Sequence, residues 1–371
     1  MRLNIKKAAC YIVLMLAFMC VTGCGSKNEE KPKAQENEFE IKVAQNVVEL
    51  YMKSLMKDDL EGARKLLTKD LSLKTKDEGN SDLKVKGYSI DETSEIGKSG
   101  LFKVKVTRMN LTKPVATLDD CSIKVIMEGS DYKIGEVKNE AEKEAFLENY
   151  TLRLRSKDNL KTNLLIDSSS FPQYVFSKDD KGNLTKLPVP RSSYSVMNFG
   201  YGGEKIAIST FDKDSFLGLI KIDESMTTQG GSTGGASDQS QGDQGKGGGA
   251  GGGTAIGREK PIGKQMAALD LIKDSKIEFM TFSNGEKFIL AQYNKTNAGR
   301  CIRVYNTDSG DLIKVNFENE YSYGKVEIVF SSFDKDVLNY DVIQRDMKDK
   351  SAAEQAGKYQ LDLKGFKIKR L

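Results

Sequence analysis

Residues 277–290 read IEFMTFSNGEKFIL, and this stretch decides the fold predicted for the C-terminal half of the chain. Residues 277–282 and 287–290 are rich in Ile and Phe, which favour β-strands. Between them, Asn284-Gly285 is a strong signal for a tight turn. The stretch therefore predicts a strand, a turn and a second strand.

The same pattern occurs in residues 195–208 and again in residues 326–340. The second and third copies start 49 residues apart, and the first and second start 82 apart with a Gly-rich insert of about 35 residues between them. A period of about 45–50 residues is typical of β-propeller blades. Three copies are visible, whereas closed propellers have about four to eight blades. The strands expected in residues 151–190 could form a further partial blade, and stacked antiparallel sheets remain the alternative.

Two segments carry a family resemblance: FSNGEKFILA at residues 282–291 and YNTDSGDL at residues 305–312. They resemble blades of TolB-like and WD40-like extracytoplasmic proteins. The resemblance implies a propeller-like all-β domain over residues 151–371, interrupted by a Gly-rich insert at about residues 225–260.

The Gly-rich insert has nothing to bury, so we expect a flexible surface loop there. A phosphate-binding loop needs the pattern G-x-x-x-x-G-K-[ST] between a strand and a helix. Gly247 follows Gly245-Lys246 and Gln265 follows Gly263-Lys264, so neither site fits. We therefore expect no nucleotide at this insert.

Residues 39–138 predict an α+β domain. Apolar residues recur at spacings of three and four over residues 41–55, which indicates an amphipathic helix. Asp58-Asp59 interrupts this pattern and offers an N-cap to a second, short helix over residues 60–67. Four strand-like segments follow at residues 83–92, 101–109, 122–127 and 132–137. Two helices followed by antiparallel strands predict a curved sheet wrapped on helices.

Residues 46–70, NVVELYMKSLMKDDLEGARKLLTKD, and residues 127–137, MEGSDYKIGEV, resemble the opening and the final hairpin of NTF2-like domains. The resemblance implies that fold for residues 39–138, and it carries over no site residue. Residues 139–150, which begin NEAEKEAFLEN, are interpreted as an acidic linker helix between the two domains.

The first 24 residues read MRLNIKKAACYIVLMLAFMCVTGC. Basic residues precede an apolar run over residues 8–21, which is short for a membrane span and typical of a secretory signal. Val21-Thr22-Gly23-Cys24 resembles the lipobox of bacterial lipoproteins, although the family most often has Leu where Val21 stands. The resemblance implies cleavage of a signal peptide (residues 1–23), lipid (palmitate-type) attachment at Cys24, and a flexible tether over residues 24–38. An ordinary signal peptide and an uncleaved anchor are the alternatives.

Composition excludes several classes of function. The formal net charge is +4, and it falls to +1 without Arg2, Lys6 and Lys7 of the signal. This balance argues against a nucleic-acid partner. There is no His, which removes Ser-His-Asp chemistry and His-ligated zinc. We expect no metal, no cofactor and no catalytic residues.

Other chemistry-bearing residues receive structural interpretations. Cys121 and Cys301 are expected to be isolated buried thiols. The carboxylate pairs Asp58-Asp59 and Asp119-Asp120 are expected at a cap or a turn. Tyr residues among the predicted strands are expected to pack in the core, with a binding surface at a propeller rim as the alternative.

These observations together predict an extracytoplasmic lipoprotein, anchored to the cell membrane through Cys24. Its expected role is a non-enzymatic module for protein interaction, scaffolding or sensing, with an unidentified cell-envelope protein as partner. A solute- or ligand-binding lipoprotein is the alternative, and a carboxylate-dependent hydrolase is a third hypothesis.

Overall fold

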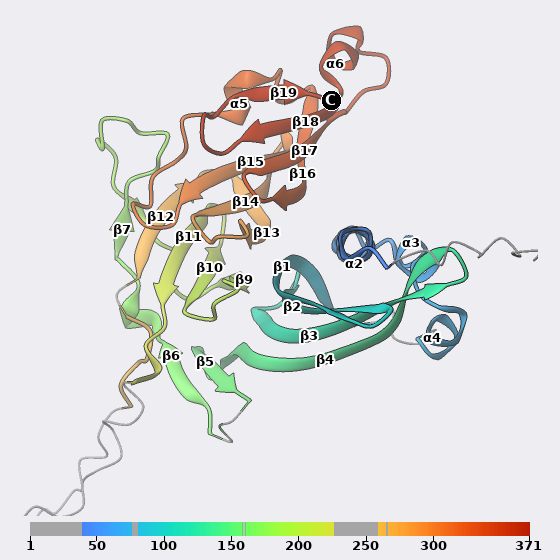
Figure 1. Ribbon diagram of the computed structural model, residues 1–371. Helices are drawn as coiled ribbons and strands as arrows, with labels where there is room; N and C mark the ends of the chain where they lie inside the picture. Colours follow the sequence, from blue (N-terminus) through green and yellow to red (C-terminus); the bar gives the residue numbers. More distant parts are fainter. Residues whose placement is uncertain (1–38, 76–80, 158, 160, 226–258, 265) are drawn as a thin grey trace, which may run out of the picture. The chain divides into compact units, whose positions relative to one another are not determined.

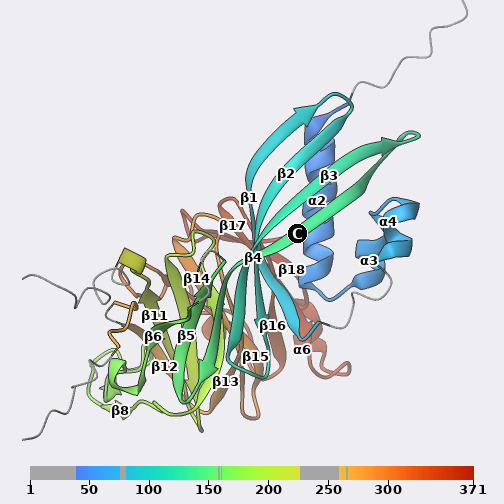
Figure 2. The same cartoon turned by 90° about the horizontal axis from the view of Figure 1, so that it is seen from below.

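The chain is mostly β-structure, with a curled half-barrel followed by a series of antiparallel sheets (Figures 1 and 2). The computed structural model describes residues 39–75, 81–157, 159, 161–225, 259–264 and 266–371. The predicted signal peptide, the lipobox with Cys24, the tether and nearly all of the Gly-rich insert lie outside these residues.

Three helices open the described chain: α2 (Ile41–Met56), α3 (Leu60–Lys65) and α4 (Lys69–Lys74). Helix α2 confirms the amphipathic prediction, because Ala44, Val48, Met52 and Met56 are buried at a spacing of four residues. The predicted cap is also confirmed: Asp59 Oδ1 accepts a hydrogen bond from the backbone N of Gly62 at 2.8 Å.

The half-barrel is a six-stranded antiparallel sheet whose strands lie in chain order. Its strands are β1 (Leu83–Ile96), β2 (Ser99–Asn110), β3 (Val115–Glu128), β4 (Asp131–Glu148), β5 (Thr151–Ser156) and β6 (Asn163–Ile166). The sheet curves around α2, as the sequence predicts (Figure 2).

The predicted linker helix at residues 139–150 is wrong. Strand β4 runs through this segment to Glu148 and pairs with β3 on one side and β5 on the other. Glu, Lys and Ala favour helices, but ladder pairing on both edges and burial of Ala145 override that weak preference. Because β5 and β6 continue the same sheet, the half-barrel also extends past the boundary predicted at residue 151.

Three further sheets correspond to the three predicted repeats. The first has the order β12-β11-β10-β9, the second β13-β14-β15 and the third β16-β17-β18-β19. Their strands are β9 (Tyr194–Phe199), β10 (Lys205–Phe211), β11 (Ser215–Lys221), β12 (Ala267–Ile272), β13 (Ser275–Phe282), β14 (Phe288–Lys295), β15 (Gly299–Asn306), β16 (Val326–Asp334), β17 (Val337–Gln344), β18 (Gly357–Asp362) and β19 (Ile368–Arg370). Each sheet is an antiparallel meander, so the arrangement is propeller-like.

Residues 151–190 do not complete another blade. Beyond β5 and β6 they form a 3₁₀ turn, η2 (Ser168–Ser170), and a two-stranded ribbon of β7 (Tyr174–Val175) and β8 (Leu187–Pro188). Two short helices lie in the connections of the last two sheets: α5 (Phe317–Glu320) between β15 and β16, and α6 (Lys350–Gln355) between β17 and β18.

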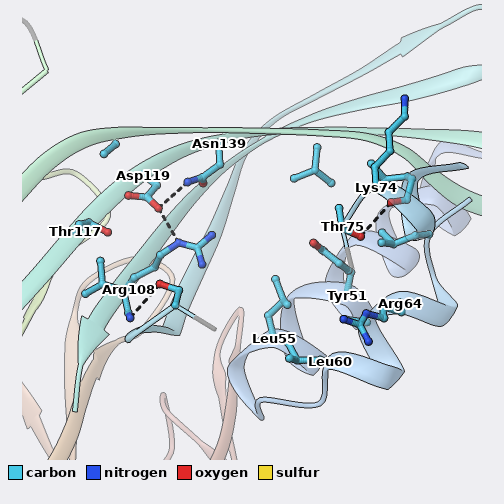
Figure 3. A pocket seen from close by; sticks show the side chains of 17 residues that line it. Tyr51, Leu55, Leu60, Arg64, Lys74, Thr75, Arg108, Thr117, Asp119 and Asn139 are labelled. Carbon is cyan, nitrogen blue, oxygen red and sulfur yellow. Dashed lines mark hydrogen bonds and ion pairs between the residues drawn. The ribbon is translucent and has the colours of Figure 1, made fainter. Parts of the chain in front are cut away.

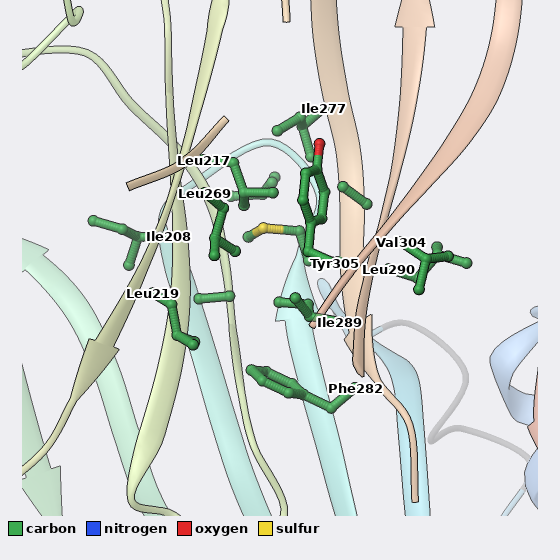
Figure 4. Close-up of a cluster of buried hydrophobic side chains, with 14 of the residues drawn as sticks. Ile208, Leu217, Leu219, Leu269, Ile277, Phe282, Ile289, Leu290, Val304 and Tyr305 are labelled. Carbon is green, nitrogen blue, oxygen red and sulfur yellow. The ribbon is translucent and has the colours of Figure 1, made fainter. Parts of the chain in front are cut away.

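Two hydrophobic cores lie on opposite faces of the half-barrel. The inner face packs on α2 through residues such as Phe102, Val104 and Val106 of β2. The outer face, with Met109 and Leu118, joins the larger core of the three propeller-like sheets. Figure 4 shows side chains of the first two of those sheets meeting in this core, including Leu217 and Tyr305. No helix in the described part of the chain is long and apolar enough to cross a membrane.

Candidate functional site

A pocket of about 680 Å³ lies between helices α2–α4 and the inner face of the half-barrel (Figure 3). Its helix side is largely apolar, and its sheet side carries polar groups on neighbouring strands. The helix side is lined by Tyr51, Leu55, Leu60, Ala63, Leu67 and Leu71, with Arg64, Lys74 and Thr75 among them. The sheet side is lined by Ser81, Leu83, Arg108, Thr117, Asp119, Val137, Asn139 and Ala141.

Strand register brings the polar residues of the pocket together. Arg108 of β2 is paired with Thr117 of β3, and Cys121 of β3 is paired with Asn139 of β4. Asp119 lies two residues from both Thr117 and Cys121, so all three face the same side of β3. The inner face of the sheet is therefore polar in this region, although it is apolar where it packs on α2.

An ion pair defines the polar wall. Arg108 Nε donates to Asp119 Oδ2 at 2.7 Å, and Asn139 Nδ2 donates to the same oxygen at 3.0 Å. The Asp119 side chain is 3% exposed, whereas that of Arg108 is 25% exposed. Asp119 accepts its hydrogen bond from Nε of Arg108. Among the described residues, none accepts a hydrogen bond from Nη1 or Nη2 of this guanidinium group. Figure 3 shows the guanidinium group extending from the sheet toward the helices.

Two further features make this wall suited to a ligand. The hydroxyl of Thr117 is buried and has no hydrogen-bond partner among the described residues. The charged side chains that line the pocket are Arg64, Lys74, Arg108 and Asp119, which leaves an excess of positive charge. Such a pocket favours an anionic group, which the end of the Arg108 guanidinium can bind with two parallel hydrogen bonds.

The cysteine beside the pocket, Cys121, is not an activated nucleophile. Cys121 faces the same side of β3 as Asp119 but does not line the pocket. Burial is the main cause that raises the pKa of its thiol to about 11. A thiol with this pKa stays protonated at neutral pH and is a poor nucleophile. No group of three or more His, Cys, Asp or Glu residues within the described ranges could hold a metal ion.

The sequence prediction that Asp119 and Asp120 lie at a cap or a turn is wrong, and it missed the place of Asp119 in the pocket. Both lie inside strand β3: Asp119 faces the pocket, and Asp120 pairs with Lys105 at 2.7 Å. Alternation along β3 could have placed them on opposite faces. The partner Arg108 lies on another strand, and no local signal in the sequence indicates it.

Other interpretations are confirmed. Cys121 and Cys301 are free and buried. Tyr293, Tyr305 and Tyr340 are fully buried, so packing rather than a rim surface explains them. Tyr321 and Tyr323, which belong to the same prediction, are only half-buried. Cys24 and the flanking residues Val21, Thr22 and Gly23 lie outside the described residues.

No family model matches this chain, and no curated protein matches it. Among solved structures, the chain is similar to TolB from Acinetobacter baumannii, with 10% identity, a TM-score of 0.27, and coverage of 76% of this chain and 57% of that one. It is also similar to the acylaminoacyl peptidase of Pyrococcus horikoshii, with 10% identity, a TM-score of 0.23, and coverage of 77% and 33%. A puromycin hydrolase matches with 7% identity, a TM-score of 0.30, and coverage of 76% and 46%.

These comparisons contradict the function predicted from the sequence, a non-enzymatic module for interaction, scaffolding or sensing. Peptidases and a puromycin hydrolase are among the matched structures, with TolB beside them. The matches assign no activity to this chain, because their TM-scores are all far below 0.5 and the chain spans about half or less of most of these structures. A Ser-His-Asp triad also cannot form from a sequence without His.

Proposed function

We propose that this protein binds a small anionic ligand with an apolar body in the pocket between α2–α4 and the half-barrel. The observation that carries the proposal is the Arg108–Asp119 pair. It holds a guanidinium group at the pocket wall with both Nη atoms free of described protein partners. The apolar side chains of the helices face this group, so a ligand with one charged end and one apolar end matches both walls.

Preorganisation supports the proposal. Asp119 accepts from Arg108 Nε and is itself held by the Asn139 side chain, so the guanidinium is already in place and binding an anion requires little rearrangement of the protein. A hydrogen bond to a charged group contributes about 1.5–3 kcal/mol. Loss of the guanidinium should therefore weaken binding of an anion by about tenfold to a hundredfold.

The test compares decanoate with the neutral 1-decanol by calorimetric titration of the purified protein. We expect decanoate to bind more tightly than decanol, and Arg108→Met to remove the difference while the binding of decanol is unchanged. Arg155→Met is the matched control, because Arg155 pairs with Glu144 on the surface and its loss changes net charge equally. Equal binding of the two ligands to the unmodified protein, or an Arg108→Met variant that still prefers decanoate, would refute the proposal.

We also propose that the protein is an extracytoplasmic lipoprotein anchored through Cys24, and that residues 39–138 belong to the NTF2-like fold. The lipobox-like residues 21–24 support the anchor, and the order of helices and curved sheet supports the fold. A Cys24→Ser variant expressed in a bacterium should lose labelling by radioactive palmitate and leave the membrane fraction. Unchanged labelling of that variant would exclude Cys24 as the attachment site.

A further inference from the structure

A second pocket, of about 340 Å³, lies where the end of α2 and strand β1 meet the second and third propeller-like sheets. Its apolar lining comes from Met56, Phe279, Val329 and Phe330. Its polar lining comes from Lys57, Lys86, Gln292, Arg300, Ser331 and Asp341. This pocket shares no lining residue with the pocket of Arg108.

The ammonium group of Lys86 is poorly paired in this pocket. Its hydrogen bond to the carbonyl oxygen of Met56 is 3.5 Å long, at the limit for such a bond. The amine lies 5.0 Å from the centroid of the Phe279 ring, and Phe279 packs edge-on against Phe330. No described carboxylate forms an ion pair with Lys86.

The surrounding charged groups are engaged elsewhere or lie farther away. Asp58 pairs with Lys84 at 2.9 Å, and Glu278 accepts a hydrogen bond from Gln292. Arg300 is held by Glu327 at 2.6 Å. The other two charged residues that line the pocket are Lys57 and Asp341, which carry opposite charges.

Burial lowers the pKa of Lys86, and it outweighs the opposing influence of Asp58. The other described lysines with a resolved shift, such as Lys103 and Lys105, have raised pKa values because carboxylates pair with them. A desolvated lysine in apolar surroundings carries more neutral amine near pH 7, and the neutral amine is the nucleophilic form.

We propose that Lys86 is a reactive-amine site that captures a small aromatic aldehyde as an imine in this pocket. The lone pair of the neutral amine attacks the carbonyl carbon and forms a C–N bond, while the carbonyl oxygen takes a proton. Loss of this oxygen as water then leaves a C=N bond, so amine and aldehyde give imine and one water without any oxidation or reduction. The rings of Phe279 and Phe330 supply the surface on which an aromatic body can pack.

The experiment incubates the full chain with 4-formylbenzoate and traps imines by reduction with sodium cyanoborohydride. Peptide mass spectrometry then compares Lys86 with Lys84, the neighbouring lysine on β1, in the same digest. Near neutral pH we expect labelling of Lys86 to be at least about threefold faster, because each unit by which a pKa falls raises the neutral fraction about tenfold. The advantage should shrink as the pH approaches about 10, where ordinary lysines also lose their protons.

Two outcomes would overturn the proposal: equal labelling of Lys86 and Lys84 near neutral pH, or a ratio that does not change with pH. A Lys86→Arg variant keeps the charge and cannot form an imine, so it should lose the fast-labelled site. Because the comparison of the two lysines uses the unmodified protein, the result does not depend on the folding of that variant.

Discussion

Replacing Asp270 by Ala should be among the most destabilising changes in the propeller-like sheets. The side chain of Asp270 is fully buried on β12, and its Oδ2 accepts hydrogen bonds from Arg303 Nη1 at 2.8 Å and from the Tyr305 hydroxyl at 2.9 Å. Its Oδ1 accepts from the backbone N of Lys178 at 2.9 Å. One carboxylate thus joins the first sheet, the second sheet and the segment that precedes β8.

The expected cost follows from the donors that lose their acceptor. The backbone N of Leu271 also donates to Oδ1, at 2.8 Å, so four buried or half-buried donors lose their acceptor, and each unsatisfied donor costs about 1–3 kcal/mol. Arg303 keeps contacts to Asp179 at 2.7 Å and to Glu318 at 3.1 Å, so its charge stays compensated. We therefore expect a loss of about 3–5 kcal/mol in the free energy of unfolding, in the range measured for broken buried ion pairs.

The assay is urea-induced unfolding of the purified protein, followed by circular dichroism and by tyrosine fluorescence, since the chain has no Trp. Asp311→Ala is the matched control: Asp311 pairs with Lys178 at 3.1 Å and its side chain is 70% exposed. An exposed pair contributes about 0–1 kcal/mol, so this variant should stay close to the unmodified protein. If Asp270→Ala loses no more stability than Asp311→Ala, the reasoning about the buried network is wrong.

Two further predictions concern close packing and pH. In Gly87→Ala the new Cβ would lie 2.5 Å from the Tyr201 hydroxyl oxygen. Gly87→Ala should lower the free energy of unfolding in urea by about 1–3 kcal/mol. A Cβ at Gly285 meets open space, so Gly285→Ala should lower it by less than about 0.5 kcal/mol. Equal losses for the two variants would contradict this account. Burial raises the pKa of Tyr194 and Tyr321 to about 12. Their contribution to stability is therefore full below about pH 10 and is lost as the pH rises toward 12. The urea concentration at the midpoint of unfolding should therefore fall between about pH 10 and 12, and tyrosinate absorbance should increase on unfolding. A midpoint that stays constant over this range would argue against the raised pKa values of the two tyrosines.

Local patterns in the sequence predict many of the elements. The spacing of apolar residues in α2 and the cap at Asp59 are short-range features, and the structure confirms both. The turn at Asn284-Gly285 and the strands on either side are equally local. Residues 139–148 show the limit of this reasoning, since their composition favours a helix while ladder pairing on both edges makes them strand β4.

The candidate sites are less accessible to sequence reasoning. Arg108 and Asp119 are 11 residues apart, yet they meet because β2 and β3 are paired in one register. Shifting that register by one residue would turn each side chain to the opposite face of the sheet. Lys86 is equally ordinary in the sequence; its distinctive feature is the contact with Phe279, almost 200 residues later.

By itself, the sequence determined the repeat of strand pairs, the amphipathic helix with its cap, and the absence of His, because each depends on neighbouring residues or on composition. Only the tertiary structure decided that residues 151–166 complete the half-barrel, that Arg108 faces a pocket, and that Lys86 is desolvated beside Phe279. The physical reason is that burial and charge pairing depend on which distant segments pack together, and short-range periodicity does not encode that choice.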